Sequence, residues 1–275
     1  MLTKIVRHLN SLARNGYRYG RDFRRFAREA PDNIDALRSL HNHHQGDTAF
    51  IVATGPSIKQ QTLSALAGKL VLSCSNIFLH PDIATISPAF HFFAPYHSPL
   101  IEANWLDWLR QGAAALPAST TIVLGHSDRT RVTASQVLKG RKVVYLHLAP
   151  LRSPRADCLS TVPGPQSVPL MALPFAFHLG VSRVVLLGCD HTTFRDYGKT
   201  IQHFYPADSD PRLNASGGAV WTGIEQELLA NLNLFSQYRK YAHLAATRGM
   251  TIQNGSPDSW LETFPRIDTR REFGI

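Results

Sequence analysis

The chain has 275 residues, of which 44% are hydrophobic and 18% charged, and its formal net charge is +9. This length and composition suit one globular domain with a sizeable core, or one with a small appendage, and exclude a disordered or fibrous protein. Because the sequence shows neither eighteen consecutive apolar residues nor a signal-peptide pattern, we expect a cytoplasmic protein.

The positive charge is concentrated at the N-terminus. Residues 1–30 hold eight basic and two acidic side chains, a net charge of +6, and the rest of the chain carries only +3. Residues 1–46 are therefore predicted as a basic helical segment, with apolar residues at helical spacing: Leu2, Ile5, Leu9 and Leu12. The segment either contacts an anionic membrane at the inner face of the cell or packs on the domain as a solvated helix. We do not expect nucleic acid as a partner, since no nucleic-acid-binding signature accompanies the charge.

Apolar strands alternate with helical patterns along residues 47–256. Strands are predicted at Thr48–Ala53, Leu70–Cys74, His91–Ala94, Thr121–Gly125, Val143–Leu148, Arg183–Cys189 and Met250–Asn254. Helices are predicted around Leu63–Leu70 and at Leu100–Gln111, Val132–Leu138, Val168–Leu179 and Ile224–Arg248. This alternation predicts an α/β, Rossmann-like domain whose mostly parallel sheet has helices on both faces. Residues 190–222, which lack a period, are predicted as an irregular lid, and residues 257–275 as a C-terminal tail.

The sequence Gly55-Pro56-Ser57 follows the first predicted strand and opens a helical pattern. Glycine lets a phosphate approach the backbone, Ser57 offers a hydroxyl, and a helix N-terminus supplies free N–H groups that attract anions. Ligands of open α/β sheets bind beyond the carboxyl ends of the strands. The motif therefore predicts a nucleotide or phosphate site, with a plain tight turn as the alternative.

Other polar residues follow predicted strands or lie in the predicted lid. The Asn76 amide suits a ribose or base edge, because it offers a paired donor and acceptor. Asp190, which precedes His191, is a candidate to bind a metal, to orient a base or to cap a backbone turn. In the lid, His203 and Tyr205 suit a base near neutral pH and a phosphate-binding phenol, or an aromatic cluster that only closes the lid.

In their order along the chain, these segments resemble one superfamily. It contains the family 42 bacterial sialyltransferases, the motility-associated factors that glycosylate flagellin, and proteins similar to hydroxymethylpterin diphosphokinase. The resemblance covers roughly residues 48–256 and is carried by Ala53–Ile58, Ser75–Asp82, Gln166-Ser167, Val184–Asp190 and His203–Tyr205.

The resemblance implies roles for individual residues. The cytidine monophosphate (CMP) of a sugar donor would be held by Thr54, Gly55, Pro56, Ser57, Asn76 and Ser167. Tyr197 lies close to the position of one of two phosphate-binding tyrosines of the family, and Thr192 occupies the position of the other. His203 is the nearest counterpart of the family's catalytic base, with Tyr205 beside it.

The leading hypothesis is a glycosyltransferase that moves a sialic-acid-like sugar from a CMP-activated donor to a cell-surface glycan or a lipid-linked acceptor. His203, Asp190 and Tyr205 would be the catalytic residues, and no metal or other cofactor would be required. The oligomeric state stays open, with a homo-oligomer as one outcome.

Two alternatives remain. The first is a diphosphokinase that uses ATP and Mg²⁺, with Asp190 and either Asp208 or Asp210 as metal ligands. The second is a non-catalytic nucleotide-binding protein of polysaccharide assembly. Two departures from the family pattern motivate it. Thr54 stands where the family usually has Asn, and of a Thr-Ser-Gly motif only Ser167 matches, with Val168 and Pro169 departing.

Overall fold

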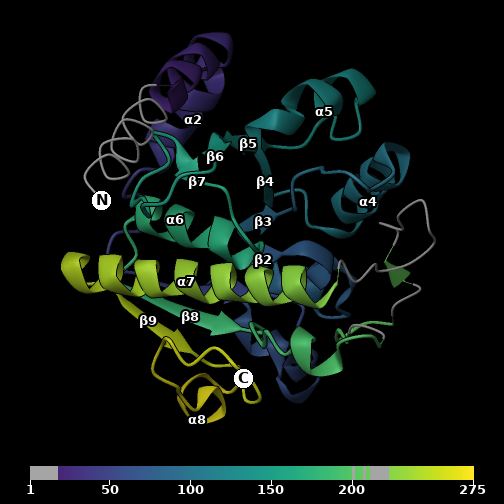
Figure 1. The fold of residues 1–275 in the computed structure, drawn as a ribbon, viewed down its shortest axis with the longest axis vertical. Helices are drawn as coiled ribbons and strands as arrows, with labels where there is room; N and C mark the ends of the chain where they lie inside the picture. The colour runs from purple at the N-terminus through teal and green to yellow at the C-terminus, as the bar shows by residue number, and fades with distance from the viewer. Residues whose placement is uncertain (1–17, 200–201, 207–208, 211–222) are drawn as a thin grey trace.

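The computed structural model describes residues 18–199, 202–206, 209–210 and 223–275 (Figure 1). Its centre is a seven-stranded sheet in the order β5-β4-β3-β2-β1-β8-β9, and every neighbouring pair is parallel. The strands are β1 Thr48–Val52, β2 Leu70–Cys74, β3 Phe90–Phe92, β4 Thr121–Gly125, β5 Val143–Leu146, β8 Arg183–Leu187 and β9 Thr251–Asn254. A separate two-stranded sheet pairs β6 Leu148–Ala149 with β7 Val162–Pro163. The prediction of a mostly parallel α/β sheet is confirmed.

The order of the strands reverses at β1, which lies between β2 and β8. Strands β1 to β5 run in sequence towards one edge, and β8 and β9 extend the sheet the other way. Because parallel crossovers are right-handed, the two series place their connecting segments on opposite faces of the sheet. Helices α6 Pro169–Leu179 and α7 Ile224–Arg248 lie across the front face in Figure 1. Helices α3 Ile83–Ile86, α4 Glu102–Ala115 and α5 Arg129–Ser135 belong to the first series.

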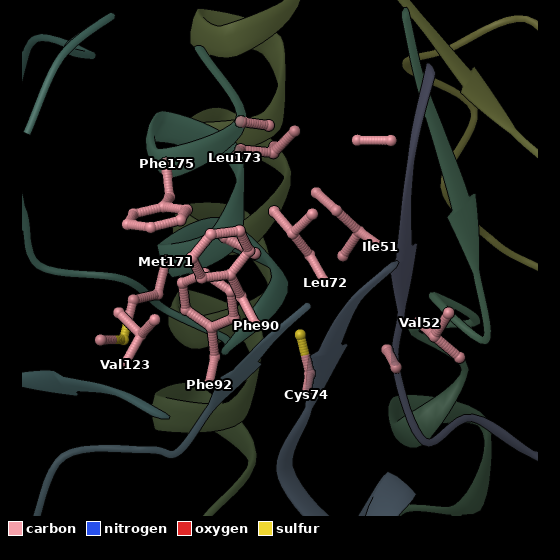
Figure 2. Close-up of a cluster of buried hydrophobic side chains, with 14 of the residues drawn as sticks. Ile51, Val52, Leu72, Cys74, Phe90, Phe92, Val123, Met171, Leu173 and Phe175 are labelled. Carbon is pink, nitrogen blue, oxygen red and sulfur yellow. The ribbon is translucent and has the colours of Figure 1, made fainter. Parts of the chain in front are cut away.

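Helix α6 forms the centre of the core, since all eleven of its residues are buried. Met171, Leu173 and Phe175 point towards the strands in Figure 2. The Phe175 ring centroid lies 4.8 Å from that of Phe90 and 5.3 Å from that of Phe92. Full burial of one such side chain contributes about 1.5–3 kcal/mol. Helix α6 therefore holds the centre of the sheet rigid beneath the carboxyl ends of its strands.

The helix predicted after the first strand is wrong. This segment forms two short 3₁₀ helices, η1 Pro56–Gln60 and η2 Leu63–Leu66. Leu63 and Leu66 are fully buried, and their spacing of three residues matches one turn of a 3₁₀ helix. The third apolar residue of the pattern, Leu70, already belongs to β2.

The N-terminal part of the described chain packs on the sheet edge. Residues 18–29 are helical and lead into α2, Pro31–Leu40. The Phe23 ring centroid lies 5.6 Å from that of His147, and the Phe26 centroid 5.5 Å from that of His126. The predicted apolar stripe from Leu2 to Leu12 lies outside the described residues. No helix within the described ranges is both long and apolar enough to cross a membrane.

Residues 257–275 pack against the end of β8. Leu261, Phe264 and Ile275 are buried, and this segment contains the short helix α8, Thr269–Phe273. The backbone N–H of Trp260 donates to the Asp190 carbonyl at 2.8 Å. The Ser259 hydroxyl donates to the Cys189 carbonyl at 2.6 Å. These bonds fix the backbone that follows β8.

Candidate functional site

A cleft of about 200 Å³ opens where the strand order reverses, beyond the carboxyl ends of β1, β2 and β8. This is the position at which open α/β sheets bind ligands. Its lining combines the turn after β1, the end of β2, the start of α6, the segment after β8 and part of the predicted lid. The lining residues are Ala53, Thr54, Gly55, Pro56, Cys74, Ser75, Ser167, Val168, Pro169, Gly188, Asp190, His191, Thr192, Thr193, Gln202 and His203.

Asp190 holds the Gly-Pro-Ser turn. The backbone N–H of Ser57 donates to Asp190 Oδ2 at 2.7 Å, and the Ser57 hydroxyl donates to Oδ1 at 2.5 Å. Both side chains are buried. Burial raises the pKa of Asp190, and the two bonds from Ser57 oppose that rise. Of the three roles predicted for Asp190, this geometry is that of a cap on a backbone turn.

The glycine of the turn is required by this packing. A Cβ atom on Gly55 would lie 2.5 Å from Asp190 Cγ and 2.5 Å from the Gly188 carbonyl oxygen. Gly188 has a φ of +64°, and a Cβ there would lie 2.6 Å from the Ala53 carbonyl oxygen. The two glycines therefore let the strand ends approach each other closely. This physical reason differs from the predicted approach of a phosphate to Gly55.

The structure also differs from the predicted anion site at the N-terminus of the helix after β1. Helix η1 has only five residues and is of the 3₁₀ type, so its dipole is weaker than that of the longer α-helix predicted here. The Ser57 N–H, which would face a phosphate in such a site, is already bonded to Asp190. The turn is thus a wall of the cleft whose Ser57 donors are satisfied within the protein.

The lid residues His203 and Tyr205 lie together beside this turn. Their rings stack with centroids 4.8 Å apart and planes 6° from parallel. The Phe204 N–H donates to the Thr54 carbonyl at 3.2 Å, which docks this part of the lid on the turn. His203 lines the cleft, whereas Tyr205 is buried behind it. The two rings therefore lie together, and of the pair only His203 is among the residues that line the cleft.

Three predicted binding residues lie outside the cleft lining. Ser57 is buried beneath the turn. The fully buried Asn76 accepts a bond from the Trp108 indole through Oδ1, and its Nδ2 has no partner among the described residues. Tyr197 is 36% exposed, and its ring centroid lies 5.9 Å from that of Phe194.

Sequence reasoning missed a contact between His191 and Tyr238. Nε2 of His191 lies 2.8 Å from the hydroxyl of Tyr238, which α7 contributes and which is fully buried. Burial lowers the pKa of His191 to about 4, so its ring is neutral at physiological pH. Tyr238 belongs to the buried face of α7 with Leu234, Tyr241 and Ala245, a spacing that indicates only core packing.

The two described candidates for the Mg²⁺ ligands of the diphosphokinase alternative, Asp190 and Asp210, contact other side chains of the protein. Both Asp190 oxygens accept bonds from Ser57, and Asp210 Oδ2 lies 3.4 Å from the Tyr205 hydroxyl. Asp208 lies outside the described residues. Within them, no three His, Cys, Asp or Glu side chains gather in a way that would hold a metal ion.

No family model and no curated protein matches the chain. Similar solved structures include the sialyltransferase CstII from Campylobacter jejuni in complex with a substrate analogue, cytidine-5′-monophosphate. It is 11% identical over 82% of this chain and 86% of that chain, with a TM-score of 0.42. A variant of the α-2,3/8-sialyltransferase CstII is 14% identical over 80% of this chain and 86% of that chain, also with a TM-score of 0.42. TM-scores of this size carry no argument about what this chain binds or does.

Proposed function

We propose that the protein is a glycosyltransferase that moves a sialic-acid-like sugar from a CMP-activated donor to a glycan or lipid-linked acceptor. The observation that carries the proposal is the cleft at the reversal of strand order. Residues from each of the five segments of the superfamily resemblance line this one space: Thr54, Ser75, Ser167, Asp190 and His203. The identity of the sugar rests on that resemblance.

The chemistry is a direct displacement. An oxygen of the acceptor forms a bond to the anomeric carbon while the bond from that carbon to the phosphate oxygen breaks, and the electron pair leaves with CMP. His203 takes the proton of the acceptor hydroxyl. Tyr205 stacks on the His203 ring and orients it. Asp190 acts as a positioning residue, because its carboxylate is occupied by Ser57.

The decisive experiment measures CMP release from CMP-activated sialic acid in the presence of glycan acceptors. We expect His203→Ala to lower the rate at least about a hundredfold, which is the usual contribution of a general base. The matched control is His243→Ala, because His243 is exposed on α7 and does not line the cleft. A fully active His203→Ala protein would contradict the assignment of the base. Turnover of ATP with Mg²⁺ instead of the CMP-sugar would favour the diphosphokinase, and tight CMP binding without turnover the non-catalytic alternative.

Helix 18–29 supports a proposal about where the enzyme works. Phe23 and Phe26 pack on the body of the protein, and five arginines of this helix are exposed: Arg18, Arg21, Arg24, Arg25 and Arg28. Their spacing places them within about a third of the helix circumference, on the side away from the two rings. We propose that this arginine face binds the anionic inner surface of the cell membrane, where lipid-linked acceptors are accessible.

Vesicle sedimentation tests the arginine face. Since each base contributes ~1 kcal/mol at an anionic surface, replacing Arg21, Arg24 and Arg28 by Gln should weaken binding to phosphatidylserine-containing vesicles about a hundredfold. Arg110→Gln, at an exposed position on α4, is a control for charge alone. Unchanged affinity in the triple variant would return helix 18–29 to a purely structural role.

A further inference from the structure

The cleft has an unusual lining for a site that takes a nucleotide. None of the described residues that line it is lysine or arginine. The Ser57 N–H and hydroxyl, the donors that the sequence offered to a phosphate, are bonded to Asp190. Within the described lining, the groups left for an anion are therefore uncharged polar groups other than those of Ser57.

His191 is placed to supply such a group. Its Nε2 lies 2.8 Å from the Tyr238 hydroxyl, and His191 is among the residues that line the cleft. Among the described residues, the structure shows a hydrogen bond to Nε2 of this ring and none to Nδ1. When the Tyr238 hydroxyl donates to Nε2, the single proton of the neutral ring lies on Nδ1, where it can be donated to a ligand.

The backbone of this segment also favours a specific position for His191. Its φ of +51° is in the left-handed region, which is uncommon for residues other than glycine, although Asn, Asp and His adopt it more often than the rest. The backbone before His191 is fixed by two hydrogen bonds: Ser259 donates to the Cys189 carbonyl, and the Trp260 N–H donates to the Asp190 carbonyl. The centroid of the Phe235 ring lies 6.4 Å from that of the His191 ring. Asp190 consequently points to the turn, whereas the His191 ring lies against Tyr238 and Phe235 of α7.

We infer that His191, oriented by Tyr238, donates a hydrogen bond to the phosphate of the ligand bound in the cleft. The inference rests on the proposed function in that the expected phosphate is that of CMP. Tyr238 is a positioning residue, because it acts through the imidazole. The pair supplies a neutral donor at a site where the described lining provides no lysine or arginine.

The test compares ligands with and without the phosphate. Calorimetry should show that His191→Leu loses tenfold or more in affinity for CMP, while its affinity for cytidine stays within about twofold of wild type. Tyr238→Phe keeps the ring volume and removes only the hydroxyl, so it should show the same selective loss to a smaller degree. His191→Asn should restore most of the CMP affinity, because Asn tolerates the left-handed backbone and its amide N–H lies near the position of Nδ1.

Inorganic phosphate and AMP separate this inference from the proposed function. If the nucleotide base is not cytosine, the proposed function fails, but AMP or phosphate alone should still bind more weakly to His191→Leu than to wild type. Equal losses for CMP and cytidine would assign His191 a structural role and overturn the inference. Wild-type protein that binds none of the phosphate-bearing probes more tightly than cytidine would also overturn it.

Discussion

The two walls of the cleft differ in where their polar groups are directed. In the first wall, formed by Thr54–Ser57 with Asp190, the polar groups point into the protein and away from the cleft. The Ser57 N–H and hydroxyl both donate to the Asp190 carboxylate. The second wall contains His191, which Tyr238 holds from behind with Nδ1 left for a ligand. The first wall has the sequence of a phosphate loop and serves as a rigid joint between β1 and β8. The chemistry available to an anion lies on the second wall.

The neighbouring residues Asp190 and His191 thus have different roles, one structural and one in the ligand site. Asp190 and His191 leave the same strand, yet one closes the fold and the other faces the ligand space. A variant in the first wall should therefore chiefly cost stability, whereas a variant in the second should chiefly change binding at neutral pH. Substitutions in each wall test this contrast.

The largest effect is expected for Gly55→Ala. The added Cβ would lie 2.5 Å from both Asp190 Cγ and the backbone oxygen of Gly188, so the turn and β8 must separate. Overpacking and a disrupted buried hydrogen-bond pair should together lower the free energy of unfolding by at least about 3 kcal/mol. Urea denaturation measures this change. The matched control is Gly20→Ala in helix 18–29, where nothing lies within 4 Å and about 0.5–1 kcal/mol of stabilisation is expected. A Gly55→Ala protein as stable as wild type would mean that the first wall is not a closed joint.

A pH dependence of intermediate size should come from the second wall. Burial lowers the pKa of His191 to about 4, below the ~6.5 of an exposed histidine. The folded state therefore disfavours the protonated ring. The stability that the neutral ring contributes is complete above pH ~6.5 and is lost as the pH falls towards 4.

The comparison of wild type with His191→Asn isolates this effect. Between pH 7 and pH 5 wild type should lose about 2 kcal/mol more than the variant. His147, whose pKa burial lowers to about 4, and His91, whose pKa it lowers to about 3, contribute equally to both proteins and cancel. Parallel pH profiles of unfolding free energy would show that His191 is not held as a neutral ring.

The fold was largely predictable because a parallel sheet buries both of its faces. Its strands are continuous apolar runs, and β2 and β4 have the predicted bounds. Helix α7 also begins and ends where predicted, because Gly249, with a φ of +66°, closes it. The segment after Ser57 was mispredicted because Leu63 and Leu66 fit a 3₁₀ turn as well as an α-helix.

The site was predictable only as a list of positions. The strand ends at residues 54–57 and 190 were correctly placed at one edge of the sheet, because carboxyl ends of parallel strands meet there. The direction of the Asp190 side chain depends on Ser57, which lies 133 residues away in the chain. The partner of His191 is 47 residues away on a helix whose pattern indicates only packing. Such pairings arise from tertiary packing and leave no local signal.

The smallest effect is expected for Tyr197→Phe. The family resemblance assigns Tyr197 to the leaving phosphate, but its ring packs against Phe194, is 36% exposed and is outside the cleft lining. Loss of this hydroxyl should therefore change the free energy of unfolding by less than about 0.5 kcal/mol, as for other surface substitutions. CMP affinity measured by calorimetry should stay within about twofold of wild type. A tenfold loss of CMP affinity, with unchanged affinity for cytidine, would mean that Tyr197 reaches the ligand and that both Tyr197 and His191 bind its phosphate.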